Sequence, residues 1–365
     1  MNIIKIPTER RYWLIRAGTN SGEFYEQFRL NGVVAVGHAN NVAFDFEDGH
    51  ELTSDETGHV INAAVAKIQE DSTTRKRGEQ ARLRSQLTRF LTEVNVGDTV
   101  ITLKESSQVV VGSVTSKPYY AEAPLYGKGT DTKVCEYNLR INVQWGTPNS
   151  RDLVPLNLEK TFRIPNTIAE FKDPHQVRTL NHWLYPIYFV DGEVRCSLRI
   201  ASEDDLSNRK LTVLSQTLDK LDLLSSYIEY ANANGSEINW NNFDAYINSG
   251  DCAYGLKAQH LFMSPGYQFI QLSGSDIKLK VFAAIYTMMF NSADVSAVDL
   301  PQGMDRHLIN SVVAQIASES EMPSLKNSLQ VSLLKKGTNT NEEDSMGITL
   351  EDTTPDSDPI DGSML

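Results

Sequence analysis

The residues most suited to chemistry in this sequence form a basic cluster in its N-terminal half. Six cationic side chains fall within residues 75–89: Arg75, Lys76, Arg77, Arg82, Arg84 and Arg89. Glu79 is the only acidic residue among them, although the chain as a whole carries a formal net charge of -13. Positive charge at this density could contact nucleic-acid phosphates. We therefore expect the five arginines to bind phosphate; the alternative is a solvated helix face.

Side chains that could perform catalysis do not form a recognisable set. Asp276 lies close in sequence to Lys278 and Lys280 but lacks the second acid that two-metal phosphodiester cleavage needs. Ser264 precedes a proline and lacks the glycines of a nucleophile elbow, and the motif G-x-x-x-x-G-K-[ST] is absent. We expect a protein without catalytic residues. A divergent nuclease or toxic effector that uses Asp276 or Lys280 is the alternative.

Metal-ligating residues are also scattered. The seven histidines show no H-E-x-x-H or paired spacing, and Cys135, Cys196 and Cys252 show no C-x-x-C spacing. We therefore expect buried free thiols, no metal site and no cofactor.

Charge and composition divide the chain into regions. Residues 1–180 carry 22 basic and 22 acidic side chains, whereas residues 181–336 carry 12 basic and 17 acidic ones. The last stretch, 337–365, has eight acidic residues, no Lys or Arg and few apolar residues. It cannot bury enough apolar surface to offset its ordering entropy, so we expect a disordered acidic tail. The total length of 365 residues predicts two or three domains.

Periodicity predicts a small mixed barrel with two or three helices over about residues 12–170. Strands are expected at 12–17, 32–37, 99–103, 109–114 and 137–145, and helices at 23–30, 53–70 and 80–94. These segments would place the basic cluster on a helix beside the barrel.

The sequence after Pro174 predicts a second, α+β region. A hairpin is expected over 184–200, with its turn at Asp191-Gly192. A long helix at 205–233, strand-like pieces within 253–272 and helices at 277–291 and 304–318 follow. The apolar run Val281–Phe290 is too short for a membrane span and predicts a buried helix. With no secretory signal pattern at the start, a cytoplasmic protein is expected.

The motifs YWLIRAG, GVVAVGH, LRSQLTRF, VGDTVITL, VVVGSV and INVQW occur in an order that resembles the PUA-like superfamily. The resemblance covers roughly residues 10–172. It is nearest to the EVE-type domain at the N-terminus of Mrr-type restriction endonucleases and related bacterial defence proteins. It implies a PUA-like mixed β-barrel over 1–175. An α+β coupling, effector or oligomerisation domain would follow over 176–336, before the tail at 337–365.

The resemblance implies recognition of a modified base that is flipped out of DNA, which requires aromatic contacts to the base and a polar group at its edge. Trp13, Arg16 and Gly18 match the W-x-x-R-A-G opening of the family. Further base-binding candidates are Tyr25, Ser85, Gln86 and Tyr119, and Phe24 and Phe28 are candidate wall residues. Trp13 and Phe28 also fit barrel-core positions, and Ser85-Gln86 stands where many relatives carry an asparagine.

The expected function is therefore a non-enzymatic sensor. Its N-terminal domain would bind modified bases in double-stranded DNA, and residues 176–336 would couple binding to a protein partner or a homo-oligomer in anti-phage defence or restriction. A reader of RNA modifications is the second alternative, because PUA-like domains serve both nucleic acids.

Overall fold

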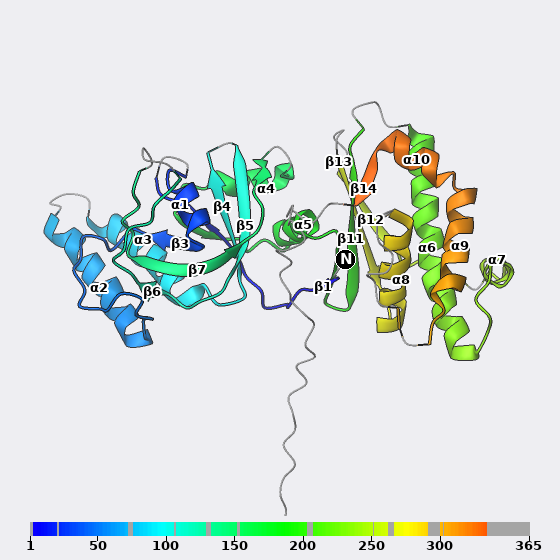
Figure 1. Cartoon of the computed structure of the whole chain (residues 1–365), viewed down its shortest axis with the longest axis horizontal. Coiled ribbons are helices and arrows are strands. Elements are labelled where there is room, and N and C mark those ends of the chain that lie inside the picture. The colour runs from blue at the N-terminus through cyan, green and yellow to red at the C-terminus, as the bar shows by residue number, and fades with distance from the viewer. Residues whose placement is uncertain are drawn as a thin grey trace, which may run out of the picture.

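A computed structural model describes residues 3–19, 22–71, 76–105, 107–128, 133–151, 154–202, 207–250, 252–261, 266–290, 300–301 and 303–333 (Figure 1). Over these residues the chain is a mixed α+β protein, which confirms the predicted fold class at that level. Two sheets lie next to each other along the long axis, each with its own helices. The stretch 337–365, expected to be a disordered tail, lies outside the described residues.

The first sheet curls into a half-barrel (Figure 1). In the described part of the chain its strand order is β3-β7-β5-β4-β2-β9, with β6 paired to β7 and β8 paired to β5. The strands are β2 (Tyr12–Ile15), β3 (Val33–Val36), β4 (Thr99–Lys104), β5 (Gln108–Val114), β6 (Tyr119–Tyr120), β7 (Leu139–Trp145), β8 (Asn149–Ser150) and β9 (Ile168–Glu170). β2 and β4 are parallel, and the other pairs are antiparallel. All five strands predicted for this half are confirmed.

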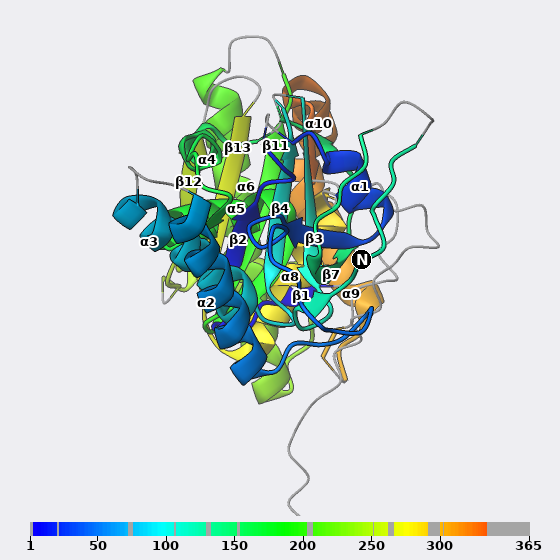
Figure 2. The same cartoon turned by 90° about the vertical axis from the view of Figure 1, so that its left-hand side faces the viewer.

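Helices cover the half-barrel. They are α1 (Tyr25–Leu30), α2 (Ser54–Asp71), α3 (Lys76–Thr88) with its π-helical extension Arg89–Glu93, and α4 (Leu156–Phe162). The three helices predicted in this half are confirmed, but the third starts four residues earlier and ends in the π-helical turn. Both figures place α2 and α3 on the outer side of the half-barrel, away from the second sheet (Figures 1 and 2). Leu83 and Leu87 anchor α3 in the core, so its other faces meet solvent.

The second sheet has the strand order β1-β10-β11-β13-β12 within the described residues, and β14 pairs with the end of β11. Its strands are β1 (Ile4–Lys5), β10 (Ile187–Val190), β11 (Glu193–Ile200), β12 (Lys257–Leu261), β13 (Gly266–Ser273) and β14 (Val331–Leu333). The helices of this half are α5 (Pro174–Leu184), α6 (Asn208–Asn234), α7 (Trp240–Asn248), α8 (Asp276–Phe290), α9 (Arg306–Glu319) and α10 (Met322–Leu329).

Successive side chains of β11 point to opposite faces of the sheet, and the two faces have different surroundings. Val194, Cys196 and Leu198 join the large core beneath α6, α8 and α9, whereas Arg195 and Ser197 point to the opposite face, where α5 lies (Figure 1). Residues 279–290 of α8 are almost all buried, so the apolar run forms the buried helix that its length predicts. In the described part of the chain, no helix is long and apolar enough to cross a bilayer.

Residues near the N-terminus belong to the second sheet. β1 runs parallel to β10, with Ile4 opposite Tyr188, and the Ile6 amide donates to the Phe189 carbonyl oxygen. The sequence analysis assigns residues 1–175 to one domain, and it contains no signal for this pairing across more than 180 residues. From β1 in the second sheet, the chain therefore crosses into β2 of the half-barrel.

Candidate functional site

The first element of the candidate site is the end of β2. Arg16 follows the strand and is half-buried, and its Nη2 donates to the carbonyl oxygens of Phe162 (2.6 Å) and Ile164 (2.8 Å). Burial, followed by the nearby Arg151, lowers the pKa of Arg16. Gly18 then turns the chain with a φ of +87°, a region that favours glycine. The rim position of Arg16 stays a prediction, and in this structure its guanidinium holds the segment that precedes β9.

An edge-to-face aromatic pair lies where the ends of β2 and β3 meet. The rings of Phe24 and Tyr137 are 5.1 Å apart with an interplanar angle of 79°, and both are half-exposed. A Cβ on Gly18 would lie 2.7 Å from Phe24 Cδ2, and one on Gly37 would lie 2.2 Å from Tyr137 Cε1. The two glycines therefore allow the rings to approach the backbone at both strand ends. The pair is a partly open aromatic surface of the kind that can stack on a base.

His38 directly follows Gly37 at the end of β3. Its Nε2 is buried and has no hydrogen-bond partner among the described residues. Burial lowers the pKa of His38 and the neighbouring Arg82 lowers it further, so the ring is neutral at pH 7. A neutral imidazole offers one donor and one acceptor. An unpartnered nitrogen of this kind near a cation is suited to a polar ligand edge.

Helix α3 supplies cations beside this position. Arg77, Arg82 and Arg84 are exposed. Arg82 Nη2 donates to the Pro165 carbonyl oxygen (2.9 Å), and Arg84 Nη1 donates to Asn62 Oδ1 (3.0 Å). Each arginine retains further N–H groups for other partners. The exposed side chains form a positive surface that could follow a phosphate backbone.

Two other predicted phosphate ligands differ from these three. Arg89 is half-buried in the π-helical turn, and its Nη1 donates to the Ile168 carbonyl oxygen at 3.3 Å. Arg75 lies outside the described residues.

Several predicted base-binding residues are core or scaffold residues in the structure. Trp13 is fully buried and Nε1 donates to Asp98 Oδ2 (2.8 Å), and Tyr25 is 1% exposed. Gln86 is buried, and its Oε1 accepts a hydrogen bond from the Ile168 backbone amide (2.7 Å). Neither ring is accessible to a base, and Gln86 fixes the start of β9. The core interpretation of Trp13 and Phe28 is therefore the one that the burial supports.

Ser85 and Tyr119 are accessible to solvent, but neither belongs to the Phe24–Tyr137 aromatic pair. Ser85 is exposed on α3. Tyr119 lies on β6, and its hydroxyl donates to Asn142 Oδ1 (2.9 Å) on the neighbouring β7.

Six residues at or near the ends of β2 and β3 define what we call the strand-end site: Arg16, Gly18, Phe24, Gly37, His38 and Tyr137. Direct packing joins Gly18, Phe24, Tyr137 and Gly37. His38 follows in sequence, and the segment 162–168 links Arg16 to Arg82. Sequence reasoning missed Tyr137 and His38. The available signal was the GVVAVGH motif itself, in which a histidine follows a strand and a glycine.

The alternative nuclease residues do not form an acidic centre. Asp276 and Lys280 make an exposed i,i+4 ion pair (2.7 Å) on α8. Lys278 Nζ lies 2.8 Å from Asp222 Oδ1 in a buried ion pair, and Asp222 Oδ2 accepts from the amides of Gly255 and Leu256. Within the described ranges, no three His, Cys, Asp or Glu side chains gather as a metal-ligand group.

Comparison with known proteins gives one family. Residues 13–172 match the model of a family described as a domain of unknown function (DUF8426). The match extends from Trp13 in β2 to Lys172 just after β9, so it coincides with the half-barrel and leaves out β1 and the second sheet. No curated protein matches the chain.

Proposed function

We propose that the half-barrel binds a modified base flipped out of DNA, with the strand-end site as the base site. The observation that carries this proposal is the Phe24–Tyr137 pair, packed against Gly18 and Gly37, with His38 and its unpartnered Nε2 one residue after Gly37. A flipped base needs an aromatic face for stacking and a polar group for its edge, and these residues offer both. The resemblance of residues 10–172 to EVE-type domains supports the same chemistry.

Flanking phosphates would bind along α3. Arg82 and Arg84 are exposed on this helix, and Arg82 is close enough to His38 to lower its pKa. In an acidic protein, a local positive surface of this kind is what allows contact with a polyanion. Binding should therefore weaken as salt concentration rises.

Coupling of this event to the second half belongs to the same proposal. Residues 176–336 would transmit base binding to a protein partner or to a second copy of the chain in anti-phage defence. The physical connection is short, because β9 leads directly into α5, which packs against β11 of the second sheet.

The test is binding of the full chain to matched duplexes that carry unmodified, methylated, hydroxymethylated or glucosylated cytosine. We expect selective binding that falls roughly tenfold in Tyr137→Ala, because stacking on one aromatic ring contributes about 1–3 kcal/mol per base. His38→Ala should reduce discrimination between the duplexes more than overall affinity. Equal binding to all duplexes, unchanged in Tyr137→Ala, would exclude the strand-end site as a base reader.

Charge reversal separates the phosphate contacts from the base site. Arg82→Glu together with Arg84→Glu should weaken binding to every duplex and reduce its salt dependence. Lys160→Glu on α4 is the matched control, because Lys160 is exposed on a different helix. A modified single-stranded RNA that outcompetes the duplexes would assign the site to RNA instead.

A further inference from the structure

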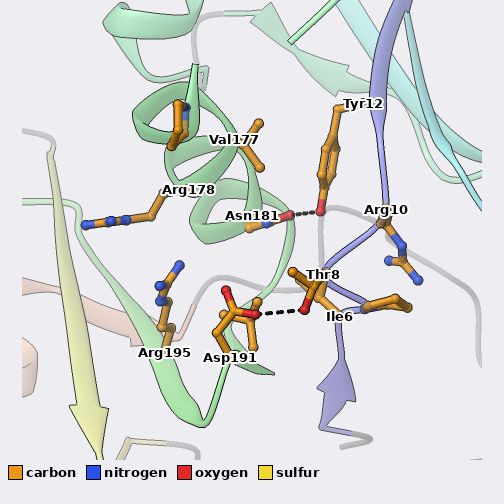
Figure 3. A pocket seen from close by; sticks show the side chains of 12 residues that line it. Ile6, Thr8, Arg10, Tyr12, Val177, Arg178, Asn181, Asp191 and Arg195 are labelled. Carbon is orange, nitrogen blue, oxygen red and sulfur yellow. Dashed lines mark hydrogen bonds between the residues drawn. The ribbon is translucent and has the colours of Figure 1, made fainter. Parts of the chain in front are cut away.

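A cleft lies between the two halves of the molecule, separate from the strand-end site (Figure 3). Its volume is about 190 Å³, and it is lined by the segment that joins β1 to β2, by α5 and by the β10–β11 hairpin. The polar lining side chains are Thr8, Arg10, Tyr12, Arg178, Asn181, Asp191 and Arg195. Three of these are arginines and one is acidic, so the lining carries an excess of positive charge.

Two of the arginines have unused hydrogen-bonding capacity. Arg178 is half-buried and makes no hydrogen bond or ion pair with any described residue. Nε of Arg10 is buried without a partner in the described part of the chain, and its Nη1 makes only a long contact of 3.5 Å with the Tyr185 hydroxyl. A buried N–H such as Nε of Arg10 is costly to leave unpaired and favours an acceptor, and the half-buried Arg178 keeps its donors available for an anion.

The third arginine is held in place by a neighbouring carboxylate. Nε and Nη2 of Arg195 donate to Glu193 Oε2 at 3.0 and 2.7 Å, and the side chain is 12% exposed. Arg195 on β11 and Arg178 on α5 both line the cleft, and Figure 3 shows them on the side away from Tyr12 and Arg10, with the Arg178 side chain directed away from Asn181 and Thr8. Both act on the buried ring of His182, whose pKa falls to about 3 chiefly through burial and further through these two cations. Arg178 and Arg195 therefore place positive charge around one position.

Neutral side chains of the lining add donors. The Tyr12 hydroxyl donates to Asn181 Oδ1 (2.6 Å), which leaves the Asn181 amide NH₂ as a donor (Figure 3). The Thr8 hydroxyl donates to Asp191 Oδ1 (2.8 Å), and Asp191 is the one lining carboxylate. The lining is thus rich in donors, and Asp191 is its one carboxylate.

We propose that this cleft binds the phosphate groups of a small phosphorylated ligand or of a nucleic-acid backbone. A phosphate presents several acceptor oxygens, which planar guanidinium groups can bind in pairs, and its higher charge suits a lining with several arginines. The lining comes from both halves of the chain, so a bound phosphate would hold them in one relative position. This inference does not depend on base recognition at the strand-end site.

Titration calorimetry with pyrophosphate and with inorganic phosphate on the full chain tests the site. We expect one site per chain and a loss of roughly tenfold or more in pyrophosphate affinity for Arg178→Ala, since hydrogen bonds to charged groups contribute at this level. Arg178 has no partner to lose, so this variant should keep its fold. Arg209→Ala removes the same charge from an exposed position on α6 and should bind like the wild type.

Asp191→Asn gives the opposite prediction. Asp191 has a φ of 51°, which asparagine tolerates, and an amide oxygen can still accept from Thr8. Removal of the lone carboxylate should raise pyrophosphate affinity several-fold. No pyrophosphate binding at millimolar concentration, or equal losses in Arg178→Ala and Arg209→Ala, would overturn the proposal.

An oligonucleotide competition identifies the source of the phosphate. An unmodified single strand that displaces pyrophosphate from the wild type, with weaker binding in Arg178→Ala, would assign the cleft to a nucleic-acid backbone. Pyrophosphate binding that the strand leaves unchanged would assign it to a small phosphorylated ligand. If base binding fails in the duplex experiment, the pyrophosphate result still stands, because Tyr137 and His38 do not line this cleft.

Discussion

A single added methyl group at Gly37 should disturb both the stability of the half-barrel and its base site. The Cβ of Gly37→Ala would lie 2.2 Å from Tyr137 Cε1 and 2.5 Å from Cδ1. The shorter distance is about 1.3 Å below the roughly 3.5 Å at which carbon atoms attract each other. The Gly37 backbone lies outside the left-handed region, so the effect comes from crowding and not from backbone strain.

The magnitude follows from what the Tyr137 ring can do. The ring is half-exposed, so it can rotate away from the new methyl group, but it then loses its contact with Phe24. Overpacking costs about 1–3 kcal/mol, and an aromatic pair contributes about 0.5–1.5 kcal/mol. We expect the free energy of unfolding to fall by about 1–3 kcal/mol, together with roughly tenfold weaker base binding.

Urea denaturation followed by tryptophan fluorescence measures the first effect, and Gly58→Ala provides the control. Gly58 lies in α2 with nothing within 4 Å of its Cβ position, so alanine there should stabilise the protein by about 0.5–1 kcal/mol. The urea midpoint should therefore fall in Gly37→Ala and rise in Gly58→Ala. A Gly37→Ala protein as stable as the wild type, with unchanged binding, would refute the placement of Tyr137 against Gly37.

Three further predictions concern buried polar groups. The free energy of unfolding should fall as pH drops from about 6.5 towards 3. His182 has a pKa of about 3 in the folded protein, so in this pH window only the unfolded chain binds a proton at this histidine. His182→Gln should therefore show a flatter pH profile in urea titrations. Lys278→Ala should cost about 3–5 kcal/mol in the same assay by leaving the buried Asp222 carboxylate without its cation, and Lys278→Ala with Asp222→Asn should recover part of that loss. Asp98→Ala should lower the thermal midpoint, since Asp98 accepts from Trp13 Nε1 and from the amides of Arg11 and Asn95; the loss should exceed about 2 kcal/mol, and a change of less than about 0.5 kcal/mol would contradict this network.

Much of the fold could be predicted from local chemistry. The hairpin at Asp191-Gly192 is confirmed because both residues take positive φ, which two-residue turns require and these residue types allow. The buried helix α8 is confirmed because its apolar run leaves no polar face. The pairing of β1 with β10 could not be predicted, since two residues carry too little pattern to identify a partner so distant in sequence. Helix α7 was also missed, although Asn239 caps it by accepting from the Asn242 amide.

The candidate site was harder to predict because polar residues in a resembling motif can be scaffold. Trp13 matches the opening motif of the resembling family, and Gln86 stands where many relatives carry an asparagine. Both use their polar atoms within the scaffold, Trp13 on Asp98 and Gln86 on the Ile168 amide. His38 and Tyr137 became candidates for other reasons. Nε2 of His38 has no hydrogen-bond partner among the described residues, and the ring of Tyr137 packs against Gly37. Such properties depend on neighbours far apart in the chain, so no local spacing reveals them.

The strand-end site and the cleft are joined by a single strand. β2 begins at Tyr12, whose hydroxyl binds Asn181 on the cleft wall, and ends at Ile15, directly before Arg16. β2 also pairs with β9, and the chain continues from β9 into α5, which carries Arg178. A ligand that moves either end of this four-residue strand must act on the other, and any coupling free energy is reciprocal. Pyrophosphate should therefore change the affinity for a modified duplex, and that duplex should change the pyrophosphate affinity by the same factor. If each ligand leaves the affinity for the other unchanged, the two sites are not linked through this strand.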